Sequence, residues 1–499
     1  MSFISSLRCT QCSEQFQEDI RELSCPKCGG VLEITYDLDV ISGILTREAL
    51  QKRAAGVWKY VELLPVSSTS KAVSLGEGGT FLHKCDRLAK HYGLQNLYLK
   101  DETTNPTGSF IDRGTAVEVT VAKERGFKSL CCGSTGNLAA SLVAYAARAG
   151  MESNVFIAQT GNVDSGKFYQ ILAYGANVTA VKNHEIALER ANAESHRSYV
   201  VNAYSPLFLE GVKTTVFEIC EQLLWNPPDW IIVPMGNGGH LSQIWKGLRE
   251  LQEIGILDSI ETRIVGIQSS GCAPIVEAFQ RGKKSISPMS SGATIALDIS
   301  VGNPSCGHTA LKAIRESNGL ALSVTDKETL DAVSSIAKLE GVFVEPASAT
   351  PIAAIKQLIK SDELEKSDSI VCIVTGMGLK YPEIARILVK GQSKLEQLLS
   401  RVEDRKFTTQ LGRTKQQILQ LLLKGESYGY GIWKCLQEEH GVSIKIPSVY
   451  QHLSELTATG LIDQTRIEKT FDNRKRAYYA LTQEGRNTIK QLSRLSKRG

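Results

Sequence analysis

Four cysteines near the start of the chain have the spacing of a metal site. Cys9 and Cys12 have two residues between them, and Cys25 and Cys28 repeat that spacing after twelve intervening residues, followed by two glycines that allow a positive φ. Two such pairs suit a tetrahedral four-thiolate zinc site, whereas a redox pair would need a βαβ context. Because so short a segment cannot bury a core, the metal would supply its folding energy. We predict a structural zinc ribbon over residues 1–36, and no catalytic metal.

Three further segments combine glycines with small polar side chains. They read GSTGN at residues 133–137, GNGGH at 236–240 and TGMG at 375–378, and each follows an apolar, strand-like run. Free backbone amides at a helix start bind phosphate or carboxylate groups well. Any one of these segments could be only a tight turn. Three of them at strand ends in one body predict a ligand site.

Strand-like and helix-like segments alternate from Val73 to Lys390. The predicted strands begin at Asn96, Lys128, Asn154, Asn177, Trp230, Arg263 and Ser369, and predicted helices include Leu138–Ala149 and Asp164–Tyr174. Such alternation predicts parallel α/β sheets, in which ligand sites lie at the carboxyl ends of the strands.

The segment KDETTNPTGSFIDRG, from Lys100 to Gly114, resembles the cofactor-lysine segment of threonine synthases, which are fold-type II pyridoxal-phosphate enzymes. Matching motifs continue along the chain: VSLGEGGT (Val73–Thr80), GSTGN, LEGVKT (Leu209–Thr214), VPMGNGGH, VGNP (Val301–Pro304), VEPASA (Val344–Ala349) and TGMGLK. The resemblance covers roughly residues 1–390. It implies an α/β fold in which a body of two parallel-sheet subdomains, residues 73–390, follows the ribbon and a connecting segment, residues 37–72.

The resemblance also implies residue roles. The cofactor phosphate would be held by the backbone amides of Gly236, Asn237, Gly238, Gly239 and His240. Thr375 would bind the pyridine nitrogen, and Asn137 the ring hydroxyl. The amino-acid carboxylate would be bound by Ser134, Thr135 and Gly136, and the pocket wall would be formed by Asn105, Thr107 and Ser109.

Position 111 departs from the family. The lysine that forms the Schiff base is replaced by Ile111, which has no amine to carry the cofactor and no proton to transfer. Another lysine, such as Lys100, Lys167 or Lys380, would need the right reach and a lowered pKa to take its place. Because Lys-to-Ile is a single-nucleotide change, an error in the sequence is another explanation.

Other departures concern substrate recognition. Phe81 stands where the family usually has proline, TGHGLKDP becomes TGMGLKYP with Met377 and Tyr381, and an arginine common before LEGVKT is absent. Binding does not require the covalent link. We therefore expect any bound pyridoxal phosphate to be held without a covalent link. The pocket could hold free pyridoxal phosphate, its adduct with an amino acid, or an amino acid alone.

The C-terminal region predicts a winged helix-turn-helix. After a linker at residues 391–406, the domain at 407–499 has helical segments at Lys415–Lys424, Ile432–His440 and Ser448–Thr459. Strand-like segments around a basic turn and a final helix at Glu484–Lys497 follow. LLLKGESYGYGIWKCL, SVYQHLSELTATGLI and RKRAYYALTQEGR resemble PadR-like transcription regulators.

By this resemblance the third helix would enter a major groove of double-stranded DNA. It would present Ser448, Tyr450, Gln451 and Ser454, and the wing would offer Arg474, Lys475 and Arg476 to phosphate or minor groove. Residues 400–499 contain 18 basic and 10 acidic residues, a balance of +8 against −4 for the rest. The alternative is a solvated basic loop in a domain that makes only protein contacts.

Composition is that of an ordinary globular protein. The 499 residues are 42% hydrophobic and 22% charged, no apolar stretch approaches ~20 residues, and the start lacks an apolar signal region. We expect a cytoplasmic protein, not bound to a membrane, whose other eight cysteines are reduced.

Two hypotheses follow. The first is a non-catalytic, ligand-sensing transcription regulator, a homodimer that binds DNA. The second is an active threonine synthase, making threonine and phosphate from O-phosphohomoserine, with an added DNA-binding domain; it requires another residue to replace the missing lysine.

Overall fold

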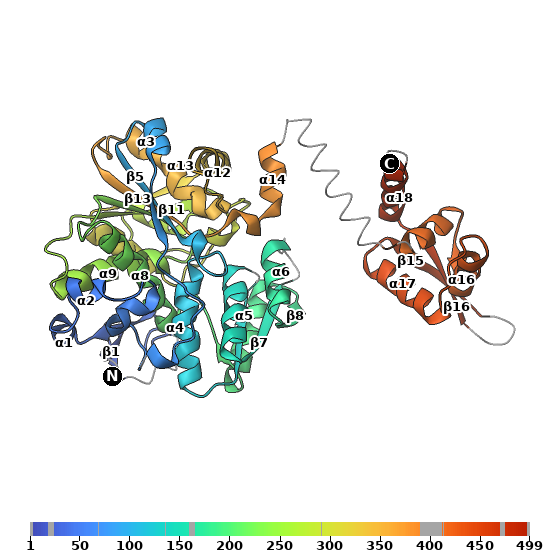
Figure 1. Cartoon of the computed structure of the whole chain (residues 1–499), viewed down its shortest axis with the longest axis horizontal. Helices are drawn as coiled ribbons and strands as arrows, with labels where there is room; N and C mark the ends of the chain where they lie inside the picture. The colour runs from blue at the N-terminus through green and yellow to red at the C-terminus, as the bar shows by residue number, and fades with distance from the viewer. Residues whose placement is uncertain are drawn as a thin grey trace. The chain divides into compact units, whose positions relative to one another are not determined.

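The computed structural model describes residues 3–17, 24–67, 69–134, 136–158, 165–290, 292–389, 412, 414–469 and 475–496. The chain divides into two compact units, Met1–Leu388 and Val389–Gly499, each described by itself (Figure 1). The predicted linker at residues 391–406 lies outside the described residues. No helix in the described ranges is both long enough and apolar enough to span a bilayer.

The N-terminal segment forms a small antiparallel sheet. Its order is β2-β1-β3, with β1 at Ile4–Cys9, β2 at Gln15–Phe16 and β3 at Leu32–Tyr36. Short helices α1 (Leu38–Ser42) and α2 (Arg47–Gln51) follow, each begun by a side-chain cap from Asp37 or Thr46.

The larger body sheet has six strands in the order β12-β11-β10-β13-β5-β4. Their bounds are β4 Phe81–Lys84, β5 Asn96–Asp101, β10 Trp230–Pro234, β11 Arg263–Ser269, β12 Leu320–Val324 and β13 Ser369–Val374. All neighbours are parallel except β4 and β5, which are antiparallel. The predicted strands therefore pair in parallel as expected, and β4, which was not predicted, adds an antiparallel edge, where the short α3 (Asp86–Tyr92) connects it to β5.

The smaller sheet is parallel, in the order β8-β7-β6-β9. It consists of β6 Ser129–Gly133, β7 Glu152–Ala158, β8 Asn177–Val181 and β9 Tyr199–Val200, with helices α5 Asn137–Ala149, α6 Ser165–Ala173 and α7 His184–Ala193. The remaining body helices are α4 Ile111–Glu124, α8 Pro206–Gln222, α9 Gly239–Glu253, α10 Pro274–Gln280, α11 Gly307–Glu316, α12 Asp326–Glu340, α13 Pro346–Lys360 and α14 Pro382–Val389.

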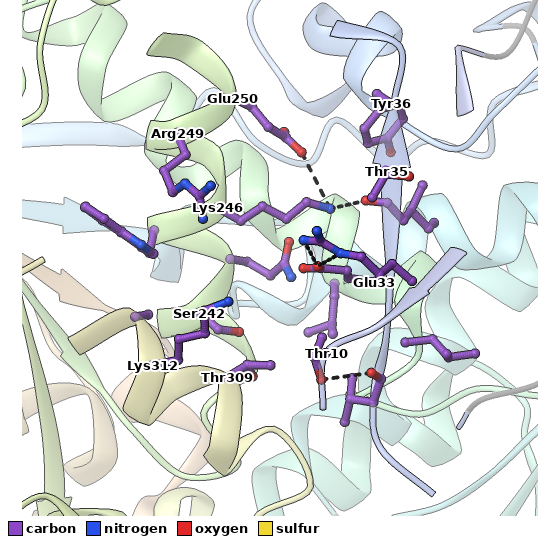
Figure 2. Close-up of a pocket in the computed structure, with 18 of the residues that line it drawn as sticks. Thr10, Glu33, Thr35, Tyr36, Ser242, Lys246, Arg249, Glu250, Thr309 and Lys312 are labelled. Carbon is purple, nitrogen blue, oxygen red and sulfur yellow. Dashed lines mark hydrogen bonds and ion pairs between the residues drawn. The ribbon is translucent and has the colours of Figure 1, made fainter. Parts of the chain in front are cut away.

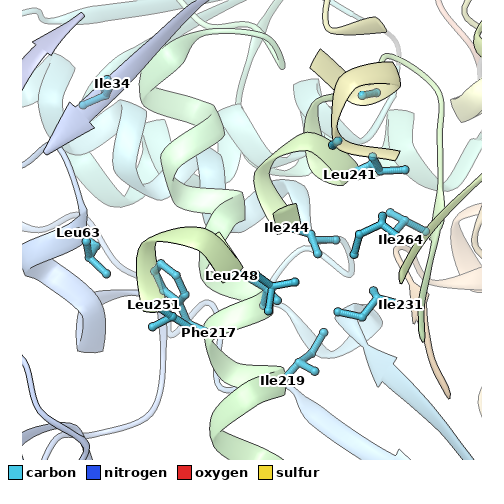
Figure 3. Close-up of a cluster of buried hydrophobic side chains, with 14 of the residues drawn as sticks. Ile34, Leu63, Phe217, Ile219, Ile231, Leu241, Ile244, Leu248, Leu251 and Ile264 are labelled. Atoms are coloured by element: carbon cyan, nitrogen blue, oxygen red, sulfur yellow. The ribbon is translucent and has the colours of Figure 1, made fainter. Parts of the chain in front are cut away.

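One apolar cluster joins the ribbon to the larger sheet (Figure 3). Ile34 of β3 lies at one side, Ile231 of β10 and Ile264 of β11 at the other, and α8 and α9 lie between them. Phe217 of α8 and Leu248 of α9 are fully buried there. Burying side chains of this size contributes about 1.5–3 kcal/mol each, so the ribbon is held to the body by its apolar contacts.

Buried ion pairs hold the first turn of α4. Arg113 donates to Glu102 at 2.6 and 2.8 Å and to both carboxylate oxygens of Glu218 at 2.7 Å, and Lys100 donates to the same Glu218 at 2.8 Å. All four side chains are almost completely buried. Removing one partner would leave an uncompensated buried charge, which costs about 3–5 kcal/mol. The network therefore fixes the position of residue 111 on the same helix.

We expect the stability of the protein to depend on pH through Glu118, which lies further along α4. Burial raises its pKa to about 8, so the folded state holds its proton more tightly than the unfolded chain does. The protonated carboxyl of Glu118 gives its full contribution to stability below about pH 4.5, and this contribution is lost as pH rises through 8. Glu118→Gln removes the ionisable group, so we expect it to raise the free energy of unfolding above that of the wild type. That increase should be about 2–4 kcal/mol larger at pH 8.5 than at pH 5. Denaturant unfolding of both proteins at the two pH values checks this, and an equal difference at both would contradict it.

The C-terminal unit has the predicted winged-helix elements. Residues 414–423 are helical, and α16 Gly429–Glu438, α17 Ile446–Ala458 and α18 Gln483–Ser496 follow; β14 Ser427–Tyr428, β15 Ile462–Lys469 and β16 Lys475–Leu481 form an antiparallel sheet in the order β14-β16-β15. The second helix begins at Gly429, not at Ile432 as predicted, because the Gly-Tyr-Gly segment forms its first turn. Leu419, Ile432 and Leu453 share one buried core.

Candidate functional site

Two loops that are far apart in sequence meet beside position 111. The amide of Phe110 donates to the carbonyl of Thr375 at 3.0 Å, and the amide of Met377 donates to the carbonyl of Gly108 at 2.9 Å. The structure thus brings the predicted pocket wall, which ends at Ser109, against the loop that was predicted to bind the pyridine nitrogen. Both loops follow the carboxyl ends of neighbouring strands, β5 and β13.

The predicted phosphate loop leaves several backbone amides without a protein acceptor in the described ranges. Within the described part of the chain, the amides of Gly236, Asn237, Gly238 and Gly239 have no hydrogen-bond acceptor, and the three glycines are buried. A Cβ on Gly236 would lie 2.9 Å from the Cα of Ile299, and one on Gly238 would lie 2.8 Å from the Cβ of Ala310. The loop therefore needs glycine, and its free amides suit an anion at the N-terminus of α9.

Ile111 lies next to this loop in apolar surroundings. Its side chain is 7% exposed and packs with Phe208, Leu209 and Cys306. A Cβ on Gly239 would lie 2.7 Å from Leu209 Cδ2 and 3.6 Å from Cys306 Sγ, so this apolar cluster borders the phosphate loop. Phe208 belongs to the segment before LEGVKT, residues 205–208, in which an arginine was expected from the resemblance.

His240 is neutral in this environment. Its ring is parallel to Phe110, with centroids 4.3 Å apart, and its Nε2 lies 3.1 Å from the hydroxyl of Thr215. Burial lowers the pKa of His240 to about 4. The side chain therefore adds no charge for a phosphate, and only the backbone of His240 fits the predicted role.

Polar partners surround the two residues predicted to bind the cofactor ring. Thr375 Oγ1 lies 2.8 Å from the hydroxyl of Ser348. The carboxamide of Asn137 donates to Glu345 at 3.2 and 3.3 Å and accepts from Lys380 Nζ at 2.7 Å. Burial raises the pKa of Glu345 to about 7. The hydroxyl of Thr375 and the carboxamide of Asn137 are thus both hydrogen-bonded to neighbouring side chains.

A charged pair lies beside the predicted carboxylate loop, and of its two residues the sequence had pointed only to Lys167. Lys167 Nζ donates to both oxygens of Asp298 at 2.7 and 2.8 Å, and the hydroxyl of Tyr381 also donates to Asp298. A Cβ on Gly136 would lie 3.5 Å from Asp298 Oδ1. Tyr381 was noted as a departure, but nothing in the sequence around Asp298 marked it.

The other members of that loop are only partly described. Ser134 accepts from the amide of Gly136 through its hydroxyl at 3.2 Å, and Thr135 lies outside the described residues. The role of this loop in binding a carboxylate stays a prediction.

A separate cavity of about 400 Å³ lies between the ribbon and α9 (Figure 2). It is lined by Glu33, Lys246 and Arg249, among others, and Lys246 extends from α9 toward the ribbon. Lys246 is paired with Glu250 at 3.5 Å, and Arg249 with Glu316 at 3.6 Å. The lining contains none of the predicted cofactor or substrate residues, so this cavity is distinct from the candidate site.

The four ribbon cysteines come together as predicted. Their sulfur atoms all lie within 4.8 Å of one another, with Cys9 and Cys28 at 3.5 Å and Cys12 and Cys25 at 3.7 Å. A tetrahedral zinc site with bonds of about 2.3 Å places its sulfurs about 3.8 Å apart, so the cluster fits one ion with no open coordination position.

Cys25→Ser tests this metal site. We expect zinc to fall from one ion per chain to near zero, and the ribbon to lose stability, because three thiolates hold the ion much less tightly than four. Elemental analysis of the purified protein measures the zinc. Cys435→Ser, outside the cluster, is the matched control and should retain full zinc. A wild-type protein without zinc would contradict the expectation.

The predicted DNA-reading residues lie on one face of α17. Tyr450, Gln451 and Ser454 are exposed and Ser448 is half-buried, whereas Val449 on the opposite face is fully buried in the core. On the wing, Arg476 is exposed and its guanidinium lies 4.9 Å from the ring of Tyr428. Arg474 and the side chain of Lys475 lie outside the described residues.

Comparison with known proteins agrees with this architecture. Residues 73–376 match the family "Pyridoxal-phosphate dependent enzyme", and residues 418–491 match the "Transcriptional regulator PadR-like family". A threonine synthase of Methanocaldococcus jannaschii is 46% identical over 381 residues, covering 76% of this chain and 93% of the relative. A threonine synthase of Methanosarcina acetivorans is 42% identical over 380 residues, covering 76% and 92%.

Solved structures agree on the fold. A fungal L-serine ammonia-lyase from Rhizomucor miehei superposes with a TM-score of 0.52 at 24% identity, covering 60% of this chain and 93% of that one. The chain belongs to the family of pyridoxal-phosphate dependent enzymes, with a threonine synthase-like body fused to a PadR-like domain.

Proposed function

We propose that this protein is a transcription regulator whose enzyme-like body binds a ligand without turning it over. The observation that carries the proposal is the burial of Ile111 among apolar side chains beside the phosphate loop, in a chain that also has a PadR-like domain. Since a hydrocarbon side chain neither carries the cofactor nor moves a proton, residue 111 cannot perform the chemistry of the family.

The residues that are present fit pyridoxal phosphate. The free amides of Gly236 to Gly239 would hold its phosphate, Thr375 its pyridine nitrogen and Asn137 its ring hydroxyl. When bound to an enzyme, this group acts as an electron sink for reactions at amino-acid carbons. Here the chain's own residues would bind and orient the ligand, or an amino acid beside it at Ser134 and Gly136.

The winged helix would bind double-stranded DNA as part of a homodimer. The exposed face of α17 and the basic charge of the C-terminal region support this proposal, since phosphate contacts provide most of the affinity for DNA. A ligand would regulate binding only if its affinity differs between the DNA-binding geometry and the other geometries of the dimer. The ribbon would hold structural zinc.

The decisive experiment measures DNA binding with and without ligand. Selection from a randomised duplex library identifies a sequence for the full-length protein. Fluorescence anisotropy then measures its affinity in the presence of pyridoxal phosphate, threonine or homoserine. We expect specific binding, with a change in affinity of at least five-fold for one of these compounds. A protein with no sequence preference, or with an affinity indifferent to every compound, would refute the proposal.

Active threonine synthesis is the second candidate. It is favoured by the 46% identity to a threonine synthase and by the intact phosphate loop. Phosphate release from O-phosphohomoserine, by protein whose Ile111 has been verified by mass spectrometry, separates the two. Turnover at the rate of an ordinary biosynthetic enzyme, about 1 s⁻¹ or faster, would establish the enzyme and exclude the non-catalytic body.

A further inference from the structure

Lys380 is a buried lysine with almost no partners. It ends the 3-10 helix Gly378–Lys380, which follows the Thr375 loop, and is 4% exposed. Its Nζ donates to Asn137 Oδ1 at 2.7 Å, a neutral oxygen. In the part of the chain that the structure describes, this amine has no other hydrogen bond and no carboxylate within 4.0 Å.

The two other lysines near the site are fully engaged. Lys100 Nζ donates to the carbonyl of Thr80, to Glu218 and to Gln222 at 2.8–2.9 Å, inside the network that holds α4. Lys167 is bound to both oxygens of Asp298. Burial lowers the pKa of Lys100 too, but its nitrogen is enclosed by three acceptors, whereas the amine of Lys380 has one neutral partner and is available for reaction.

Lys380 also lies beside the loop that leads to position 111. Its Cε is 3.4 Å from the point that a Cβ on Gly108 would occupy, in the loop that leads to Ile111. Its partner Asn137 is the residue proposed to contact the ring hydroxyl of pyridoxal phosphate. In that molecule the aldehyde is attached to the ring carbon next to the hydroxyl. If Asn137 contacts that hydroxyl, an amine hydrogen-bonded to Asn137 would lie within reach of the aldehyde carbon.

We propose that Lys380 takes over the anchoring role lost at position 111 and holds pyridoxal phosphate covalently. The lone pair of Nζ would add to the aldehyde carbon, one water would leave, and a carbon–nitrogen double bond would form; nothing is oxidised or reduced. The inference rests on the proposed function and deepens it, because it says how a non-catalytic body would retain its ligand.

The charge of Lys380 suits this reaction. Burial lowers its pKa to about 8, although the carboxylates of Glu345, Asp112 and Asp298 that face it act in the opposite direction; Lys167 lowers it further. At pH 7 about one amine in ten is therefore neutral and nucleophilic, compared with fewer than one in a thousand for an ordinary lysine. Formation of the covalent link should accordingly speed up between pH 6 and 8.

The test is covalent trapping in the full-length protein. The protein is incubated with pyridoxal phosphate, reduced with borohydride, digested and analysed by mass spectrometry. We expect one phosphopyridoxyl group per chain, on the peptide that contains Lys380, and a missed tryptic cleavage at that residue. Lys380→Arg keeps a buried cation opposite Asn137 but cannot form the link, so it should lose at least nine-tenths of the label.

Equilibrium dialysis without borohydride separates this inference from the proposed function. If both proteins bind the cofactor but the wild type carries no label, only the role of Lys380 is refuted. Label on Lys100 or Lys167, or label spread over surface lysines and unchanged in Lys380→Arg, also overturns it. If dialysis detects no binding of the cofactor to the wild type, the cofactor is not the ligand, and the inference falls with that part of the proposed function. A Lys380→Arg protein with an unchanged melting temperature shows that lost label does not reflect unfolding.

Discussion

Ile111→Lys is expected to restore threonine synthesis, raising the rate of phosphate release from O-phosphohomoserine by at least a hundredfold over the wild type. The variant places an amine in the first turn of α4, beside the free amides of the phosphate loop. Proton transfer by a positioned group alone contributes about 10²–10⁴-fold, and the covalent attachment of the cofactor adds to that. The apolar neighbours Leu209 and Cys306 should lower the pKa of the new amine and so favour its neutral form.

Ile111→Met is the matched control. Methionine is unbranched and similar in length to lysine but has no amine, so it should change the packing without restoring activity. A coupled assay for phosphate measures both variants under saturating cofactor. If Ile111→Lys is no faster than Ile111→Met, then the other departures from the family's pattern, at Tyr381 and in the segment before LEGVKT, also prevent the reaction.

Gln451→Ala is expected to weaken specific DNA binding about tenfold while leaving non-specific binding nearly unchanged. Gln451 is exposed on α17, where its amide donates to Glu455 at 3.1 Å, and it is free to exchange that bond for a base edge. A good base contact contributes about 1–3 kcal/mol of discrimination. Anisotropy with the selected sequence and with a scrambled duplex measures the two affinities.

Arg476→Ala should behave differently, because a phosphate contact carries no sequence information. We expect it to weaken binding to both duplexes by similar factors and to reduce the slope of log affinity against log salt by about one. Lys434→Ala on α16, where the lysine lies 3.8 Å from Glu438, removes one charge elsewhere on the domain and is the control. If Gln451→Ala weakens both duplexes equally, α17 does not read bases.

Local patterns predicted much of the fold. Every strand predicted in the body is present, because apolar runs ending in glycine-rich loops are strong signals. The short strand β12 was not predicted; it is a strand because it pairs with β11, a contact that no local pattern shows. The antiparallel β4 edge was missed for the same reason.

The candidate site was predictable where motifs supplied it. The four cysteines meet, and the loops at Gly236 and Thr375 lie at strand ends on the same sheet. The pairing of Lys167 with Asp298 could not be predicted, since the two residues are 131 positions apart and neither belongs to a motif that joins them. The single neutral partner of the Lys380 amine could not be predicted either. It depends on which carboxylates pair with the neighbouring lysines, and only the folded structure shows this pairing.

The ion pairs under α4 have a consequence for how such a protein can arise. Arg113, Glu102 and Glu218 support the helix from its buried side, while the side chain of Ile111 contributes only apolar contacts. Chemical reactivity and architectural support are thus assigned to different side chains. A substitution at position 111 can therefore remove the reactive amine of the family without removing any ion pair that holds the helix.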